Sequence, residues 1–131
     1  MKKVIILFLL AILSLWIIAQ QKDDYLDPVI EKLKAADAGG LATFFNKTVE
    51  LKLPDHEGTF SASQGEMIMK DFFKKYPLDT FSVMQKGTTD NISRFAICEY
   101  FSGLSKYQVY LYMRKDKEQF FIQKIKFEEK K

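Results

Sequence analysis

The stretch that decides the fold is Glu31–Asp55, EKLKAADAGGLATFFNKTVELKLPD. It predicts a helix, a break around two glycines, a second short helix and then a strand that ends at Pro54. In the strand, residues 49–53 (VELKL) alternate apolar with charged side chains, which is typical of a strand with one buried face. The rest of the chain is expected to supply elements that pack against this stretch.

The two helices of this region have recognisable boundaries. The first is expected to begin with Asp27 as N-cap and Pro28 at the first helical position. Its apolar residues fall at helical spacing: Val29, Ile30, Leu33 and Ala36. Asp37 is expected to cap the second helix, although Gly39 and Gly40 could instead close the first one.

The remaining chain predicts one more helix and four strands. After a turn-rich loop over residues 54–58, Ser61–Gln64 matches a capping box, and Ser63–Glu66 matches it in an overlapping register. The third helix should end before Pro77. The apolar period then falls to two, and strands are expected at about 81–85, 92–101, 107–114 and 120–127. Helices followed by antiparallel strands predict an α+β fold with the helices on one face of the sheet.

The first nineteen residues have the layout of a secretory signal peptide. Lys2 and Lys3 precede the almost wholly apolar run Val4–Ile18, and Ala19 is a small residue suited to cleavage before Gln20. A retained membrane anchor is the alternative, but the apolar run is shorter than the roughly 20 residues that a spanning helix needs. No cysteine lies near the cut, which argues against a lipid anchor.

We therefore expect residues 1–19 to be a signal peptide and residues 20–131 to form a single domain, exported to the periplasm, to the cell envelope or to the medium. The membrane would be contacted only through the signal segment, if it stayed uncleaved. Without the two signal lysines, 18 basic residues remain against 17 acidic ones. This balance gives no basic face for nucleic acid.

Composition indicates a globular domain with a real core. The chain is 131 residues long, 47% apolar, 28% charged and 15% aromatic, and aromatic side chains bury much area each. Cys98 is the only cysteine, so no disulfide can form within the chain. Because Cys98 follows Ala96 and Ile97, we expect a buried, inert thiol; a bridge to another molecule is the alternative.

Two blocks of sequence carry a family resemblance. The first is AADAGGLATFF followed by VELKLP; the second is EMIMKDFFKKY leading into FSVMQKG, RFAICEY, KYQVYLYMRK and FFIQKIKFEE. From Asp27 to Glu128 the chain resembles the nuclear transport factor 2-like superfamily, and within it short exported bacterial domains of unassigned function. The resemblance implies a cone-shaped α+β fold, with a bent antiparallel sheet packed on three helices and a pocket at the open end. A cystatin-like fold is the alternative.

The resemblance leaves function open, because the superfamily includes isomerases, dehydratases, polyketide cyclases and non-enzymatic binding or dimerising modules. Enzymatic members need an acid or a histidine in the pocket. His56 is the only histidine, and it sits in a turn between Asp55 and Glu57. We expect a solvated loop there rather than a metal site, since adjacent residues rarely converge on one ion. No cofactor motif is present.

Glu99 is the weak catalytic candidate, because it interrupts the apolar strand FAICEYF. If it faced the interior, desolvation would suit it to proton transfer. Alternatively, it lies at the rim or on the outer face, paired with a lysine of a neighbouring strand. Strand alternation puts Glu99 with Phe95, Ile97 and Phe101, and Ala96, Cys98 and Tyr100 on the opposite face; the pattern alone does not say which face is inside.

The candidate pocket residues are Phe44, Phe72, Phe95, Ile97, Glu99 and Phe101. Tyr110 and Tyr112 share one strand face and are the candidate interface residues, because outward tyrosines suit a protein interface; cross-strand pairing on a wet face is the alternative. The expected function is an exported, non-catalytic domain that binds a small apolar ligand or a protein partner, with a homodimer as one form. A pocket enzyme of the isomerase or dehydratase type is the alternative.

Overall fold

The structure, a computed structural model, describes residues 25–131. The elements are α2 (Leu26–Lys34), α3 (Ala38–Ala42), β1 (Phe45–Lys52), β2 (Glu57–Ser61), α4 (Ala62–Lys75), β3 (Thr80–Asp90), β4 (Ser93–Ser102), β5 (Ser105–Asp116) and β6 (Gln119–Lys130). The expected signal peptide lies outside the described residues. Within them, no helix is both long enough and apolar enough to span a bilayer.

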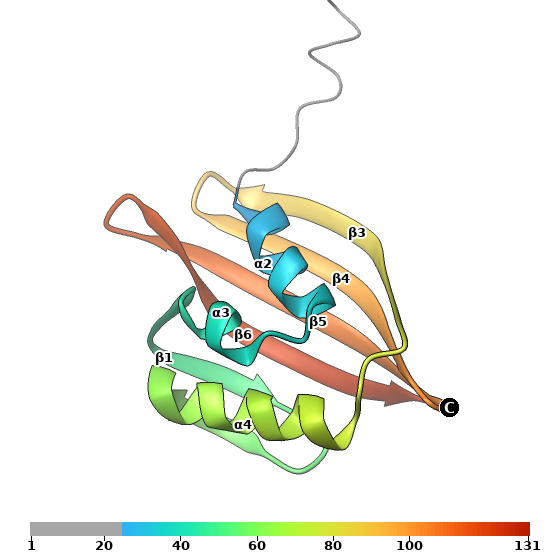
Figure 1. Cartoon of the computed structure of the whole chain (residues 1–131). Coiled ribbons are helices and arrows are strands. Elements are labelled where there is room, and N and C mark those ends of the chain that lie inside the picture. Colours follow the sequence, from blue (N-terminus) through green and yellow to red (C-terminus); the bar gives the residue numbers. More distant parts are fainter. Residues whose placement is uncertain (1–24) are drawn as a thin grey trace, which may run out of the picture.

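The strands form one curled six-stranded sheet in the order β2-β1-β6-β5-β4-β3, and the three helices lie on one face of it (Figure 1). This confirms the α+β, cone-like architecture expected from the sequence. The expectation of a purely antiparallel sheet was wrong at one place, because β1 pairs with β6 in parallel, with Glu50 opposite Lys124. The chain enters the sheet with β1, next to the edge strand β2, and returns beside β1 only with the last strand, β6.

Local contacts explain where the first helices begin and end. α2 begins at Leu26 with Tyr25 in the N-cap position, so Asp27 lies inside the first turn rather than capping it. Asp37 caps α3 as expected, accepting the Gly40 N–H at 2.9 Å. The left-handed residue between the helices is Ala36, with φ 51°, so the glycines do not close α2. The backbone turns at a residue that resists this conformation, which indicates that packing fixes the turn.

α4 uses the first of the two predicted capping boxes. The Ser61 hydroxyl accepts the Gln64 N–H at 3.2 Å, and the Gln64 side chain accepts the Ser61 N–H at 3.3 Å. The strand β2, which ends at Ser61, was not predicted. It is a short edge strand whose residues are exposed or half-buried, so its sequence carries little apolar alternation.

The space between helices and sheet is filled by side chains. At one end, six aromatic rings from α4, its C-cap, β4, β5 and β6 form a cluster: Phe72, Phe73, Tyr76, Tyr100, Tyr107 and Phe127. Phe72 is central, with ring centroids 4.4 Å from Phe127 and 5.7 Å from Tyr100. The Tyr100 hydroxyl donates to the Tyr76 carbonyl, tying β4 to the end of α4.

Candidate functional site

Strand β4 has a buried and an outward face, and the structure assigns them. Ala96, Cys98 and Tyr100 are fully buried beneath the helices. The alternate residues point to the outer face of the sheet and are half-buried: Phe95, Ile97, Glu99 and Phe101. The prediction that these four residues line an interior pocket was therefore wrong. Strand alternation turns their side chains away from the space between the sheet and the helices.

Glu99 does not face the interior, as a pocket base would have to. Its carboxylate lies 3.5 Å from the Lys106 ammonium on the neighbouring strand, and 24% of its side chain is exposed. Across the β4–β5 ladder it faces Gln108. The structure thus matches the alternative, an outer-face carboxylate paired with a lysine.

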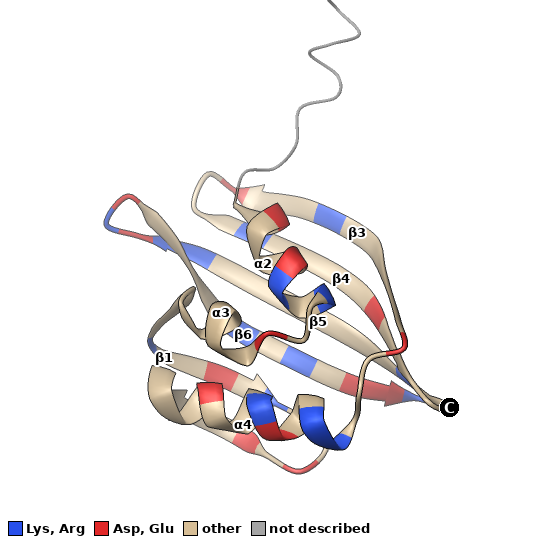
Figure 2. Ribbon diagram, in the orientation of Figure 1, with Lys and Arg blue, Asp and Glu red and all other residues tan. Residues whose placement is uncertain are grey.

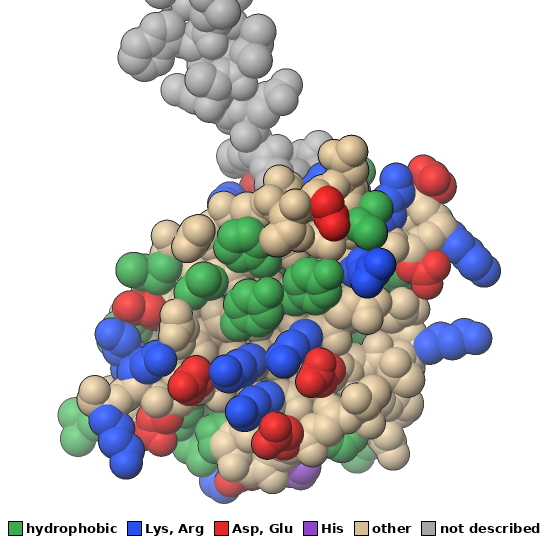
Figure 3. Space-filling model, turned by 180° about the vertical axis from the view of Figure 1, so that it is seen from behind, with side chains coloured by type: hydrophobic (Ala, Val, Ile, Leu, Met, Phe, Trp, Pro, Cys, Tyr) green, Lys and Arg blue, Asp and Glu red, His purple; other side chains and the backbone are tan. Residues whose placement is uncertain are grey.

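The two interface candidates lie on the same outer face. Tyr110 is directly opposite Ile97, and Tyr112 is directly opposite Phe95. We call these four residues the outer patch; all are half-buried. The Tyr112 hydroxyl is 3.0 Å from the hydroxyl of Ser93, which holds the ring in place. Figure 3 shows hydrophobic side chains gathered in the middle of this face.

A charged band runs beside the outer patch. It contains two ion pairs, Glu50 with Lys124 at 3.6 Å and Glu128 with Lys126 at 3.4 Å. Figure 3 shows positive and negative side chains side by side in this band, and Figure 2 shows both signs along the strands. The outer face therefore combines an apolar area with a row of mixed charge.

The outer face is also uneven. Three hollows of about 480, 420 and 300 Å³ lie on it next to one another. Tyr110 lines the first and third, and Ile97 lines the second and third. Hollows of this kind can receive the side chains of a partner protein.

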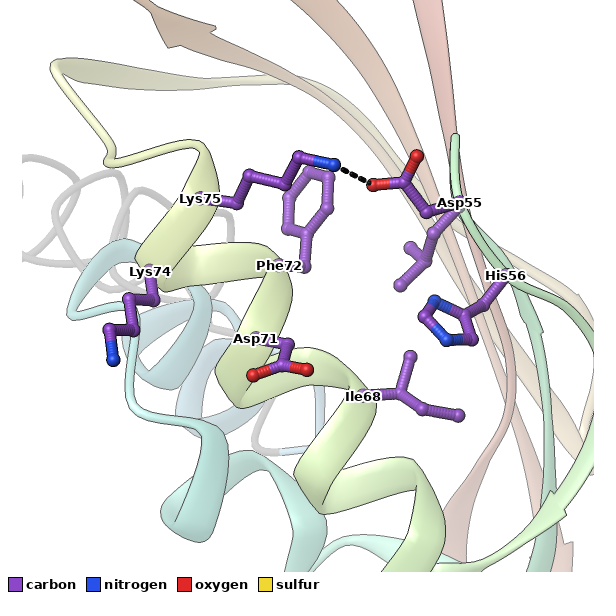
Figure 4. Close-up of a pocket in the computed structure, with 8 residues that line it drawn as sticks. Asp55, His56, Ile68, Asp71, Phe72, Lys74 and Lys75 are labelled. Atoms are coloured by element: carbon purple, nitrogen blue, oxygen red, sulfur yellow. Dashed lines mark hydrogen bonds and ion pairs between the residues drawn. The ribbon is translucent and has the colours of Figure 1, made fainter.

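A separate cavity of about 350 Å³ lies between α4 and the turn that joins β1 to β2 (Figure 4). Its floor is apolar: Phe72 and Leu53 are buried and Ile68 is half-buried. On one side, Asp55 and Lys75 form an ion pair at 2.7 Å. Each partner stabilises the charged form of the other, since their hydrogen bond lowers the pKa of Asp55 and raises that of Lys75. We call this the α4 cavity.

Two further polar side chains line the α4 cavity from different elements. In Figure 4 the His56 ring points from the turn toward α4, and Asp71 lines the same cavity from α4. The Leu53 N–H donates to the His56 carbonyl at 2.7 Å, which fixes the turn. His56 was expected in a solvated loop, and it is exposed. Across residues 25–131, no group of three potential metal-binding side chains converges.

Of the pocket candidates, only Phe72 borders the α4 cavity. Phe44 is half-buried and lines a hollow of about 300 Å³ at the opposite end of the domain, beside Tyr25 and Phe120. Sequence analysis missed Ile68, Asp71 and Lys75, although their spacing puts them near Phe72 on one side of α4.

The titratable groups buried in the interior resist ionisation. Cys98 is a free, buried thiol, as expected, and burial raises its pKa to about 11. Burial also raises the pKa of the Tyr100 and Tyr107 phenols. At neutral pH all three are uncharged, so they act as core residues.

The profile of a family described as a domain of unknown function (DUF4783) matches residues 26–128. A DUF4783 family protein from Bacteroides uniformis superposes with a TM-score of 0.75 at 20% identity, covering 80% of this chain and 96% of that one. No curated protein matches the chain.

More distant structures share the architecture. A ketosteroid isomerase-like protein from Erwinia carotovora atroseptica has a TM-score of 0.63 at 10% identity, covering 79% of this chain and 89% of that one. An NTF-2 like protein of unknown function from Silicibacter pomeroyi has a TM-score of 0.58 at 9% identity, covering 80% and 92%. These likenesses show a nuclear transport factor 2-like fold.

Proposed function

Because the chain belongs to the DUF4783 family, a domain of unknown function with a nuclear transport factor 2-like fold, we propose that it is a non-catalytic binding domain whose outer sheet face pairs with a second copy of itself. The observation that carries this proposal is the outer patch. It is the side of the sheet away from the helices, and it holds four large apolar or amphipathic side chains. Tyrosine gives contact area at low cost in conformational entropy, and interface cores are enriched in aromatic residues.

The charged band favours a second copy over an unrelated partner. Glu50 and Glu128 alternate with Lys124 and Lys126 on one face. In a two-fold interface the same surface meets itself, so each residue type must find its complement within the same patch. A band that carries both signs can do this, whereas a band of one sign would repel its copy.

The size of the face also fits. Six strands at about 4.8 Å spacing, with an average length of about ten residues, give a face about 24 Å wide and about 33 Å long, or roughly 800 Å². A stable interface buries about 800 Å² on each partner. Most of the outer face would have to take part, including the three hollows.

Charge-swapped variants test self-pairing directly. One variant carries Lys124→Glu and Lys126→Glu, and the other carries Glu50→Lys and Glu128→Lys. Each variant alone should be monomeric, because its band has one sign, and an equal mixture should form mixed dimers in native mass spectrometry. Met67→Glu is the matched control, since Met67 is 70% exposed on α4 and lies off the outer face. Unchanged dimers in each separate variant, or no pairing in the mixture, would refute the proposal.

We also propose that the domain is exported and that residues 1–19 are removed. The support is the sequence of that segment: two lysines, an apolar run and Ala19 before Gln20. Expression of the full chain in a bacterial host, followed by N-terminal sequencing of the periplasmic product, tests this. The expected first residue is Gln20; an uncleaved chain in the membrane fraction would contradict it.

A further inference from the structure

The α4 cavity shares no lining residue with the outer patch or the charged band. It is built from the end of β1, the β1–β2 turn and the second half of α4. A ligand could therefore occupy it in a monomer or in a pair of copies. The kind of ligand that fits the cavity depends on which of its polar groups already have a hydrogen-bond or ion-pair partner.

The floor of the cavity is suited to an apolar ring or chain. Phe72 and Leu53 keep only 4% and 6% of their surface exposed, and Ile68 is half-buried beside them. Ligand sites are mostly apolar with a few convergent polar groups, and a volume of about 350 Å³ lies at the small end of their range. The floor thus favours a compact organic molecule over an ion.

The two lysines of the lining are not available to the cavity. Lys75 is paired with Asp55 at 2.7 Å. In Figure 4 the Lys74 side chain points away from the cavity on the other side of the helix. An anionic ligand would therefore meet no unpaired cation facing it, and it would meet the carboxylates of Asp55 and Asp71.

Two polar groups that line the cavity can accept hydrogen bonds from a ligand. The Asp71 carboxylate forms no hydrogen bond or ion pair with another residue of the described range, and the same holds for the His56 ring. The two line the cavity from different elements, His56 from the β1–β2 turn and Asp71 from α4. A carboxylate can only accept hydrogen bonds, and a neutral imidazole has one accepting nitrogen, so a donor in the cavity has two acceptors available to it.

We propose that the α4 cavity is a binding site for a small organic amine, with its apolar part on Phe72, Leu53 and Ile68 and its ammonium group between Asp71 and His56. The ammonium supplies a positive charge for the Asp71 carboxylate and hydrogen-bond donors for that carboxylate and for the accepting nitrogen of His56. The Asp55–Lys75 pair closes one side of the site without competing for the ligand.

Three indoles that differ in the terminal group test this: tryptamine (an amine), tryptophol (a neutral alcohol) and indole-3-propionate (a carboxylate). Binding to residues 20–131 is followed by amide shifts in ¹H–¹⁵N NMR titrations. Tryptamine should bind at least about fivefold more tightly than tryptophol, since a charged hydrogen bond contributes more than a neutral one. The shifted amides should lie in residues 53–56 and 68–75.

Asp71→Asn is the decisive variant, because Asp71 is exposed and its loss removes charge without removing packing. It should weaken tryptamine about tenfold and leave tryptophol within about twofold. Glu118→Gln is the matched control at the far β5–β6 turn, and it should change neither affinity. Preference for indole-3-propionate, equal binding by all three, no binding by any, or shifts centred on the outer patch would each overturn the proposal. None of these results depends on whether the outer face pairs.

Discussion

The hydroxyl of Tyr100 gives a prediction whose size and pH dependence both follow from the structure. Tyr100 is fully buried, and its hydroxyl donates to the Tyr76 carbonyl at the C-cap of α4. In Tyr100→Phe the ring contacts with Phe72 and Phe127 remain, and only this bond is lost. A lost hydrogen bond that leaves a half-buried acceptor unpaired costs about 1.5 kcal/mol of unfolding free energy near neutral pH.

The difference between the two proteins should shrink in alkali. Burial raises the pKa of Tyr100 in the folded protein, whereas an unfolded tyrosine ionises near pH 10. The raised folded pKa means that stability is fully present below about pH 10 and is lost as pH rises above it. At about pH 11 ionisation of the unfolded chain removes about 1.4 kcal/mol from the wild type, and nothing from Tyr100→Phe at this position.

Urea unfolding of both proteins at about pH 7, 9, 10 and 11 measures this. The expected difference falls from about 1.5 kcal/mol to near zero, because Cys98 and Tyr107 are present in both proteins and cancel. Phe73→Leu is the control: it loosens the same aromatic cluster without removing a titrating group, so its difference from wild type should stay constant. A Tyr100→Phe difference that is constant from about pH 7 to 11 would refute the account of this hydroxyl.

Three further changes test the local explanations. Cys98 should react with iodoacetamide at neutral pH only after unfolding, because burial raises its pKa to about 11; rapid labelling of the folded protein would contradict this. Asp37→Ala should cost about 1 kcal/mol in chemical unfolding, since it removes the α3 cap on the Gly40 N–H; no loss would mean that the cap is redundant. Gly65→Ala should destabilise by about 1 kcal/mol, because the new Cβ would lie 2.8 Å from Val49 and overpacking outweighs the gain in helix propensity; a more stable variant would show that α4 can shift.

Much of the fold could be predicted because its signals are local. The capping box at Ser61, the cap at Asp37 and the stop at Pro77 depend on neighbours a few residues away, and all three hold. The strand period of two also holds in β4 and β5, where buried residues alternate with less buried ones. These features gave the order of elements and the α+β class.

The parallel pairing of β1 with β6 could not be predicted in this way. It joins Glu50 to Lys124 across most of the chain, and no local pattern records it. The short edge strand β2 was missed for a different reason. It pairs on one side only and its residues stay exposed or half-buried, so alternation is weak.

The sequence also could not predict which side of β4 faces the core. Both faces of this strand are rich in apolar residues, so alternation gives two sets without saying which is inside. The structure buries Cys98 and Tyr100 and turns Ile97 and Glu99 outward. The same result moves the candidate site, because residues expected in a pocket become part of the outer patch.

The α4 cavity was missed because its walls come from segments that are separated in sequence. His56 stands in a turn that looked solvated, and Asp71 looked like one more charge on the wet side of a helix. They line the same cavity only because β1 pairs with β2 and α4 packs over these two strands. Neither residue has a sequence signature for this role.

The most direct test of the central claim is sedimentation equilibrium of residues 20–131 at about 1 to 100 μM, with wild type and Tyr110→Glu side by side. The account predicts that the wild type has twice the chain mass at the upper concentrations, and that Tyr110→Glu is monomeric because it places a charge in the middle of the outer patch. A wild type that keeps the mass of one chain up to about 100 μM would contradict the claim that the outer sheet face pairs with itself.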